Sequence, residues 1–231
     1  MVAPGLRLRK LSEPTIARLP LYQRIAEDWS ARGLSRIDSR QIGELAGVTA
    51  TTVRRDLAGL GSLGTRGAGY EVRVLSERIG EVLGHDRRYD VVVVGLGNLG
   101  RALVNSSNFL IRGARLAALY DVDPEIVGTE VAGLVVRSLD EPIVGATVGV
   151  ICVPPTAAQD VVNRLVAADI HALLNFAPQV VTVPIGTAVH YVDVSIELQI
   201  LMYHLLNGTG PLGGGLLHSL GIATSIATRC E

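Results

Sequence analysis

Three glycines at fixed spacing are the residues of this 231-residue chain best suited to binding a phosphate group. Gly95, Gly97 and Gly100 form the pattern G-x-G-x-x-G directly after the run Val91–Val94. In a dinucleotide-binding turn, the first glycine makes the tight turn, the second lets backbone N–H groups approach a pyrophosphate, and the third lets the next helix pack closely on the strand. The pattern therefore predicts a pyrophosphate site at the start of a helix, where unpaired N–H groups attract anions.

An acidic residue follows at the distance that a dinucleotide site requires. Residues 115–120 are typical of a second strand, and Asp121 stands at its end. A carboxylate in this position accepts hydrogen bonds from the adenosine ribose hydroxyls, whereas Asp123 adds a negative charge that repels a 2′-phosphate. We therefore expect NAD(H) rather than NADP(H). The expected contacts are Gly95, Leu96, Gly97, Asn98, Leu99, Gly100 and Asp121.

A parallel sheet is needed to position these groups. The Val91–Val94 run is too short and too β-branched for a helix, and it suits a central strand that is buried on both faces. Residues 147–153 and 170–174 are expected as further buried strands, with a helix over 157–168 between them. Ligands bind at the carboxyl ends of such strands. The candidates beside a nicotinamide are therefore Val153, Pro154, Asn175, Phe176 and Pro178, with a packing role for Phe176 as an equal alternative.

A second candidate site lies in the first third of the chain. Residues 14–32 have apolar side chains at spacings of three and four, which predicts an amphipathic helix with Pro20 as a kink or as the start of a second helix. Ser39 is expected to cap a short helix that ends at Gly47, and Thr49 to cap a further helix over 50–60. Two short helices joined by a turn form a helix-turn-helix, with an ordinary helical hairpin as the alternative.

Polar residues on the second of these helices favour DNA binding over the plain hairpin. The residues that can reach base edges or phosphates are Thr51, Thr52, Arg54 and Arg55. A glycine-rich segment follows over 61–70, with Arg66 at its tip, and is typical of the wing of a winged helix. Such a hairpin needs positive φ angles, which we expect at Gly64, Gly67 and Gly69. A linking helix over 71–83 then leads to a domain boundary within 84–90.

Charge and cysteine content narrow the class of protein. The first 90 residues carry more basic than acidic side chains and the remainder carries the reverse, which favours two domains with different partners. Cys152 and Cys230 form neither a disulfide framework nor a metal cluster. The N-terminus lacks the apolar core of a signal peptide and no long uncharged apolar run follows, so we expect a cytoplasmic protein.

The end of the chain combines an apolar helix with a glycine-rich tail. Residues 194–206 predict a helix that is apolar nearly all round, so some other surface must cover it. The segment 207–231 has six glycines and no periodicity, and we expect a mobile tail. The expected domains are therefore a winged helix over 1–84, an NAD(H)-binding core over 85–193, the helix over 194–206 and the tail over 207–231.

The chain resembles Rex-type redox-sensing transcriptional repressors. The matching segments are residues 18–22 (RLPLY), 53–57 (VRRDL), 64–70 (GTRGAGY), 95–103 (GLGNLGRAL), 120–124 (YDVDP), 175–178 (NFAP) and 192–199 (VDVSIELQ). The resemblance implies an α/β fold with an N-terminal winged helix, a Rossmann-like NAD(H) domain and a C-terminal helix swapped between the subunits of a homodimer. It also implies release of a palindromic operator DNA when NADH binds, so that the repressor follows the NADH/NAD⁺ ratio.

The resemblance further implies roles for single residues. A carboxylate matching Asp193 reaches the cofactor site of the other subunit and pairs there with an arginine matching Arg24 in the NADH-bound state. Arg66 and Tyr70 of the wing are retained. A tyrosine that the family often has is replaced here by Ser106, and aromatic residues around the wing are replaced by Leu60 and Leu63, which changes its packing.

Two other functions compete with this one, because a fold alone does not decide function. An NAD-dependent oxidoreductase would need proton-transferring groups at the strand ends. The only lysine is Lys10, outside the core, and we find no histidine–carboxylate pair there, so we expect no enzymatic activity. The third interpretation is a coenzyme A or other nucleotide-binding module without a regulatory role.

Overall fold

The computed structural model describes residues 11–65, 68–106, 109–110 and 113–207. Arg66, Gly67, Lys10, Cys230 and nearly all of the expected tail therefore lie outside the described residues. The chain divides into two compact units. The first contains Met1–Gly84 and the part of the chain from Ile200 onward, and the second contains His85–Gln199. None of the described helices is long and apolar enough to cross a membrane.

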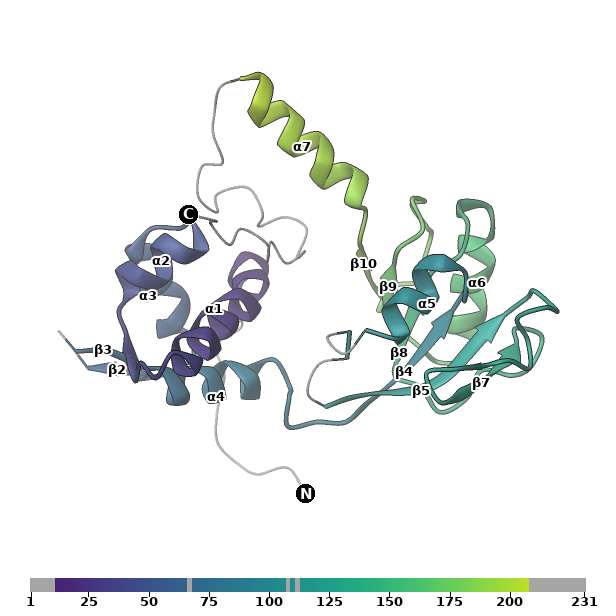
Figure 1. Ribbon diagram of the computed structural model, residues 1–231, viewed down its shortest axis with the longest axis horizontal. Helices are drawn as coiled ribbons and strands as arrows, with labels where there is room; N and C mark the ends of the chain where they lie inside the picture. Colours follow the sequence, from purple (N-terminus) through teal and green to yellow (C-terminus); the bar gives the residue numbers. More distant parts are fainter. Residues whose placement is uncertain (1–10, 66–67, 107–108, 111–112, 208–231) are drawn as a thin grey trace. The chain divides into compact units, whose positions relative to one another are not determined.

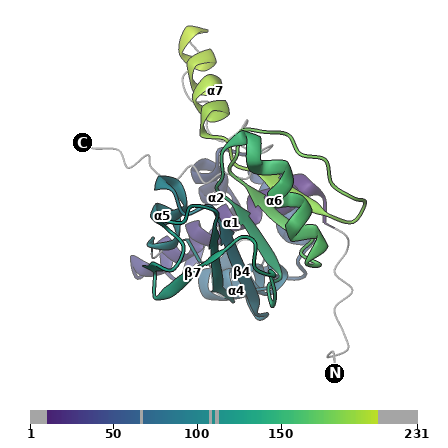
Figure 2. The same ribbon diagram turned by 90° about the vertical axis from the view of Figure 1, so that its right-hand side faces the viewer.

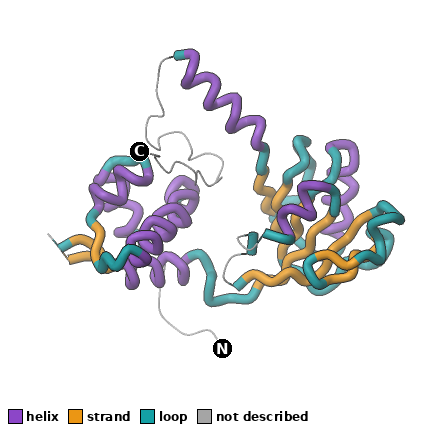
Figure 3. Tube along the Cα trace, in the orientation of Figure 1, coloured by secondary structure: helices purple, strands orange, loops and turns teal. Residues whose placement is uncertain are grey.

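The first unit is built mainly of helices, with three short strands (Figures 1 and 3). Its elements are α1 (Glu13–Ala31), β1 (Arg36–Ile37), α2 (Ser39–Ala46), α3 (Ala50–Ala58), β2 (Gly64–Thr65), β3 (Gly69–Glu71) and α4 (Val72–Val82). The strands form an antiparallel sheet in the order β1-β3-β2. Helices α2 and α3, with strand β1 before them and strands β2 and β3 after them, have the arrangement of a winged helix, so the plain hairpin is excluded.

Local capping explains the lengths of the short helices. Gly47, in the left-handed region with φ 65°, ends α2, and the Thr49 hydroxyl accepts a hydrogen bond from the Thr52 N–H at 3.1 Å to begin α3. The expected cap at Ser39 is wrong by one residue. Asp38 caps α2 instead, because its carboxylate accepts two backbone N–H bonds at 2.8 Å while Gln41 accepts one from the Asp38 N–H, which forms a capping box.

Proline and glycine positions in this unit differ partly from expectation. Pro20 is exposed and lies inside α1, which continues as one helix. Gly69 has the expected positive φ of 67°, but Gly64 does not. Close packing favours glycine at this position instead, because a Cβ at Gly64 would lie 2.9 Å from Cε1 of the Tyr70 ring.

A buried carboxylate joins α1 to α3. Asp56 of α3 is only 2% exposed, and its two oxygens accept hydrogen bonds from Arg18 Nε and Nη2 at 2.6 and 2.8 Å. The hydroxyls of Thr15 and Tyr22 each donate a further bond at 2.9 Å. Burial raises the pKa of Asp56, but these four donors outweigh it and hold the pKa below its usual value. The network therefore ties α3 to α1 through four hydrogen bonds.

The second unit is an α/β fold around a seven-stranded sheet (Figures 1 and 2). Its elements are β4 (Tyr89–Val94), α5 (Asn98–Val104), β5 (Ala114–Asp121), β6 (Glu130–Val131), β7 (Leu134–Ser138), β8 (Val148–Ile151), α6 (Pro155–Ala167), β9 (Ala172–Asn175) and β10 (Ala188–Tyr191). The strand order is β10-β9-β8-β4-β5-β7-β6, parallel except for the pair β6–β7. The sequence interpretation missed β6, β7 and β10.

The predicted central strand is confirmed. β4 pairs with β5 on one side and with β8 on the other, and its last four residues are buried. Val92 and Val94 pack in the cluster that contains α6, whereas Val91 and Val93 pack in the cluster on the opposite face. Figure 2 shows α5 and α6 on opposite sides of the strands. Burial on both faces explains why β4 is an uninterrupted valine run.

Helix α7 (Val194–Leu206) has no buried residue. Apart from the half-buried Ile200, its large apolar side chains are exposed, from 39% at Ile196 to 84% at Leu206. The set also includes Val194, Leu198, Leu201, Met202, Tyr203 and Leu205. An apolar helix of this length is not stable by itself in water, because helices owe most of their stability to packing.

Replacing Asp56 should destabilise the first unit. Asp56→Asn leaves the buried Arg18 guanidinium without its counter-charge, so we expect the free energy of unfolding to fall by about 3–5 kcal/mol. Trp29, the only tryptophan, packs against the core of this unit, so its fluorescence during denaturation reports the loss. The control is Glu44→Gln, which removes an exposed carboxylate 3.6 Å from Arg40 and should cost less than about 1 kcal/mol.

The same variant gives a pH test. Since the folded-state pKa of Asp56 is lowered, its stabilisation is fully present above the unfolded-state value of about 3.9 and is lost as pH falls through the folded-state pKa. The stability difference between the parent and D56N should therefore be constant near neutral pH and shrink below about pH 4. A difference that is independent of pH would show that the charge of Asp56 contributes nothing.

Candidate functional site

Two of the three glycines after β4 are required by the fold itself. Gly95 has a φ of 95°, and a Cβ there would lie 2.5 Å from the carbonyl oxygen of Cys152. A Cβ at Gly100 would collide with the carbonyl oxygen of Gly95. These glycines therefore make the turn and the close helix–strand approach, as the sequence predicts.

Gly97 has no such structural reason. Its φ is −66°, which any residue adopts, and no atom lies within 4 Å of the position of a Cβ. It is exposed and precedes α5, whose first turn has no side-chain cap among the described residues. The chain itself does not need a glycine at this position. A glycine here is consistent with a site where a ligand approaches the backbone closely.

The loop between these glycines is held by two charged side chains. The Leu96 N–H donates a 2.6 Å hydrogen bond to Asp121 Oδ2, and Arg101 Nε donates one of 2.8 Å to the Leu96 carbonyl. The Leu96 side chain is fully buried, so the N–H, the carbonyl and the side chain of this residue are all held in place. Arg101 was not among the expected site residues, because its role depends on a backbone carbonyl five residues earlier.

Asp121 lies at the carboxyl end of β5, with 8% of its surface exposed. Its Oδ1 accepts bonds from the N–H groups of Val122 and Asp123 at 2.7 and 2.9 Å. A carboxylate has about four acceptor positions, and backbone donors in the described chain occupy three of them. One position remains for a donor such as a ribose hydroxyl.

A cleft of about 310 Å³ adjoins Asp121. Its lining comes from the carboxyl ends of β4, β5 and β8 and from the start of α6: Val94, Gly95, Gly97, Asp121, Val122, Asp123, Ile126, Leu139, Cys152, Val153, Pro154, Ala157 and Val161. Apolar walls beside a single buried carboxylate suit an adenosine group. Burial raises the pKa of the Cys152 thiol to about 12, so this cysteine is a neutral wall residue and not a reactive thiolate.

The expected nicotinamide neighbours on the next strand do not line this cleft. Asn175 is 1% exposed, and its amide bonds the Gln179 carbonyl and the Ala177 N–H, so it shapes its own loop. Phe176 is half-buried against the cluster of Val91 and Val93, while Pro178 is exposed.

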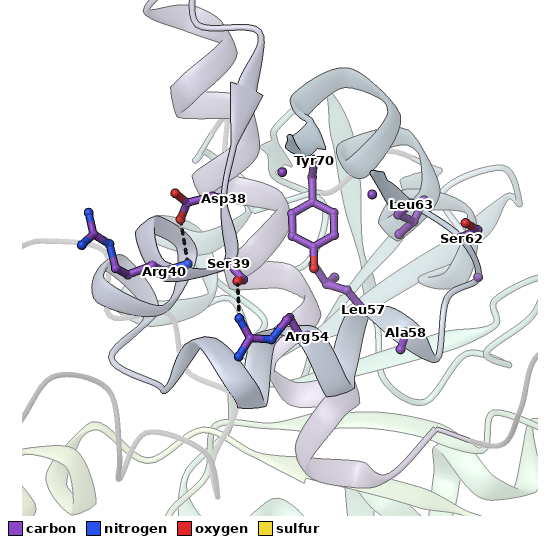
Figure 4. Close-up of a pocket in the computed structure, with 12 residues that line it drawn as sticks. Asp38, Ser39, Arg40, Arg54, Leu57, Ala58, Ser62, Leu63 and Tyr70 are labelled. Carbon is purple, nitrogen blue, oxygen red and sulfur yellow. Dashed lines mark hydrogen bonds between the residues drawn. The ribbon is translucent and has the colours of Figure 1, made fainter. Parts of the chain in front are cut away.

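The winged helix carries its own candidate site (Figure 4). A groove of about 670 Å³ runs between α2, α3 and the wing, with Asp38, Ser39, Arg40, Arg54, Leu57, Ala58, Gly61, Ser62, Leu63, Gly64, Gly69 and Tyr70 along it. Arg54 and Arg55 are exposed on α3, and Arg54 bonds the hydroxyls of Ser39 and Thr51, each at 3.1 Å. The Thr52 hydroxyl bonds that of Thr49. Arg66 lies outside the described residues.

The two expected switch residues belong to different units of the chain. Arg24 is exposed on α1 of the first unit. Asp193 directly precedes α7, where its Oδ1 accepts bonds from the Ser195 N–H and hydroxyl at 2.9 and 2.7 Å. These bonds lower the pKa of Asp193 and keep it charged.

Both parts of the chain have counterparts among known proteins. Residues 10–58 match a family described as putative DNA-binding protein N-terminus, and residues 86–179 match the CoA binding domain family. Along most of its length, the chain is similar to the redox-sensing transcriptional repressor Rex of Streptomyces griseus. The two are 47% identical, and the match covers 87% of this chain and 81% of the relative. The Rex protein of Rhodopirellula baltica is 42% identical, with 88% of each chain covered.

Solved structures of similar proteins match along most of the chain as well. RSP in complex with β-NAD⁺ and operator DNA matches with a TM-score of 0.78 and 32% identity, covering 87% of this chain and 94% of RSP. The complex of RSP with β-NADH matches with a TM-score of 0.76 and 31% identity, covering 87% and 96%.

Alanine at Gly97 and at Gly100 should have opposite consequences. Gly100→Ala places a methyl group against the Gly95 carbonyl, so we expect a lower melting temperature. Gly97→Ala meets no atom and should melt like the parent, yet bind NADH at least ten-fold more weakly by calorimetry. Undiminished NADH binding by Gly97→Ala would show that no ligand approaches this backbone.

Proposed function

The chain belongs to the Rex family of redox-sensing transcriptional repressors, and on this basis we propose that it occupies operator DNA when NADH is scarce and leaves it when NADH binds. The family is one of regulators that bind NAD⁺ or NADH and DNA, not of enzymes. The winged helix would contact DNA and the second unit would hold the dinucleotide. Membership along most of the chain also disfavours an unregulated coenzyme A module.

The observation that carries the cofactor proposal is Gly97. The fold does not require a glycine there, yet it lies beside the buried acid Asp121 in one apolar cleft. We propose that the backbone from Gly95 to Gly100 binds the pyrophosphate, with Leu96, Asn98 and Leu99 contributing its inner residues. Asp121 would accept a bond from the adenosine ribose, while Val153 and Pro154 would lead toward the nicotinamide.

Discrimination between the two redox forms would depend on burial of the nicotinamide. A cationic ring costs more to remove from water than a neutral one. We propose that Pro154, Asn175 and Phe176 form the ring pocket together with Asp193 of the partner subunit. Asn175 would act by fixing the loop that carries Phe176. NADH would bind more tightly than NAD⁺ and favour a closed dimer.

The exposed apolar surface of α7 supports the dimer. We propose that α7 is exchanged between two subunits, because a second copy of this chain supplies the cover that the described residues of one copy do not. In the NADH-bound dimer, Asp193 would pair with Arg24 of the other copy and hold the winged helices at a separation that no longer fits two DNA half-sites.

We propose that DNA binding uses both parts of the winged helix. Recognition helices of a dimer read half-sites one DNA turn apart, so the operator would be palindromic. The proposed contacts are Thr51, Thr52, Arg54 and Arg55 of α3 with Arg66 and Tyr70 of the wing.

Titration of an operator complex with NADH separates this function from the alternatives. The probe is a duplex selected from a random library by the parent protein. A redox-sensing repressor releases this duplex as NADH rises and holds it with NAD⁺. An oxidoreductase or a simple nucleotide-binding module would select no duplex at all.

Cofactor choice is the first consequence to test. Because the Asp121 carboxylate is held in place by three backbone N–H groups, it cannot turn away from a 2′-phosphate. NADPH should therefore bind at least ten-fold more weakly than NADH in calorimetric titrations, and lower salt should widen the difference. Equal affinities would mean that Asp121 does not face the adenosine ribose.

The pairing of Asp193 with Arg24 is the second consequence. Asp193→Ala and Arg24→Ala should each still bind NADH but release DNA only at several-fold higher NADH, and the double variant should be little worse than either alone. Arg32→Ala, which removes another exposed arginine after the same helix, is the control. Parent-like release by both single variants would assign the latch to other residues.

A further inference from the structure

The position of Arg54 differs from that of its neighbour Arg55, although both are exposed on α3. Arg54 lines the groove between α3 and the wing, and its guanidinium is held by the hydroxyls of Ser39 and Thr51 at 3.1 Å each. Arg55 does not line the groove and makes no side-chain hydrogen bond or ion pair within the described chain. One arginine is therefore fixed beside α2 and the other is available to move.

The groove has the location that a DNA strand would take. A recognition helix enters the major groove, and a wing reaches the adjacent minor groove. Between these two grooves lies one sugar–phosphate strand. An element between α3 and the wing therefore meets phosphate and not base edges.

The polar groups of the groove suit a phosphate. Figure 4 shows the Tyr70 hydroxyl directed toward the side of the groove where Arg54 lies, and the Ser39 hydroxyl bonded to Arg54. Burial raises the pKa of Tyr70, with the positive charge of Arg54 opposing this, so the phenol stays protonated at neutral pH and can donate. Asp38 also lines the groove, but its Oδ1 accepts the N–H groups that begin α2, and the Arg40 side chain extends away.

We propose that Arg54, Ser39 and Tyr70 form a cradle for one backbone phosphate of the bound DNA, and that Arg55 is the arginine that reads a base. This inference rests on the DNA binding proposed above, and it gives the two arginines of α3 different roles in that binding. Arg54 and Tyr70 give affinity that does not depend on sequence. Arg55 gives discrimination, for which a guanine is the commonest arginine target.

A salt series with two duplexes tests the division. The full chain and its variants bind the selected duplex and a scrambled duplex of equal length, followed by fluorescence anisotropy. Arg54→Ala should weaken both by the same factor, roughly ten-fold, and make the plot of log affinity against log salt shallower by about 0.9 for each phosphate that is no longer neutralised. Arg54→Lys keeps the charge and should keep the slope. Tyr70→Phe should weaken both duplexes with an unchanged slope, and Arg55→Ala should reduce mainly the preference for the selected duplex.

A chemical change in the DNA provides the second arm. Methylphosphonates placed one at a time in each half-site remove single charges. At one position the parent should lose affinity while Arg54→Ala loses none, because the variant has no guanidinium to bind that phosphate. Unchanged melting temperature and NADH affinity of Arg54→Ala exclude a folding defect.

The outcomes are distinct. If Arg54→Ala abolishes the preference between duplexes, or no methylphosphonate position is coupled to it, the phosphate cradle is wrong while DNA binding stands. If the parent itself selects no duplex, the proposed function fails and the cradle with it.

Discussion

Buried carboxylates hold the segments that form the two candidate sites, and the structure depends on them. In the first unit, Asp56 draws four donors from Arg18, Thr15 and Tyr22 and so fixes α3 by its inner face. In the second, Asp121 draws three backbone donors and fixes the loop at Leu96. A buried carboxylate without these partners would be strongly unfavourable, so each network resists rearrangement. The outward-facing residues Arg54 and Gly97 are thereby positioned by contacts within the chain itself.

Signals that are local in sequence allowed much of this to be predicted. The valine run with its glycines, and the turn at Gly47 followed by the Thr49 cap, each lie within a few residues and identify β4 and α3. Features that depend on distant contacts were missed. The Arg18–Asp56 pair spans 38 residues, and Arg101 acts on a carbonyl. Strands β6, β7 and β10 lie at or near the sheet edges, where apolar patterning is weak.

The three glycines show why a motif by itself cannot separate structure from function. Gly95 and Gly100 are explained by φ and by close packing, so any α/β domain with this turn would keep them. Only Gly97 is unexplained by the chain's own packing. The sequence assigns all three to one pattern, and the distinction needs the positions of neighbouring atoms. In the wing, likewise, Gly64 is favoured by its close contact with the Tyr70 ring and not by its φ, contrary to the expectation from sequence.

A redox signal of this kind is limited by energetics. NADH can shift a dimer between open and closed states only by the ratio of its affinities for the two states, and a change from 1:99 to 99:1 needs a ratio of about 10⁴. In the proposed dimer the exposed apolar side chains of α7 would be covered in both states, because exposing them in either would add a hydrophobic free energy larger than the signal. In the proposed dimer the movement would therefore keep α7 packed and change contacts just before its first residue, where Asp193 lies. A charged pair at the edge of an apolar interface that persists in both states would suffice. Such a pair contributes a small free energy to the closed state without breaking the apolar contact.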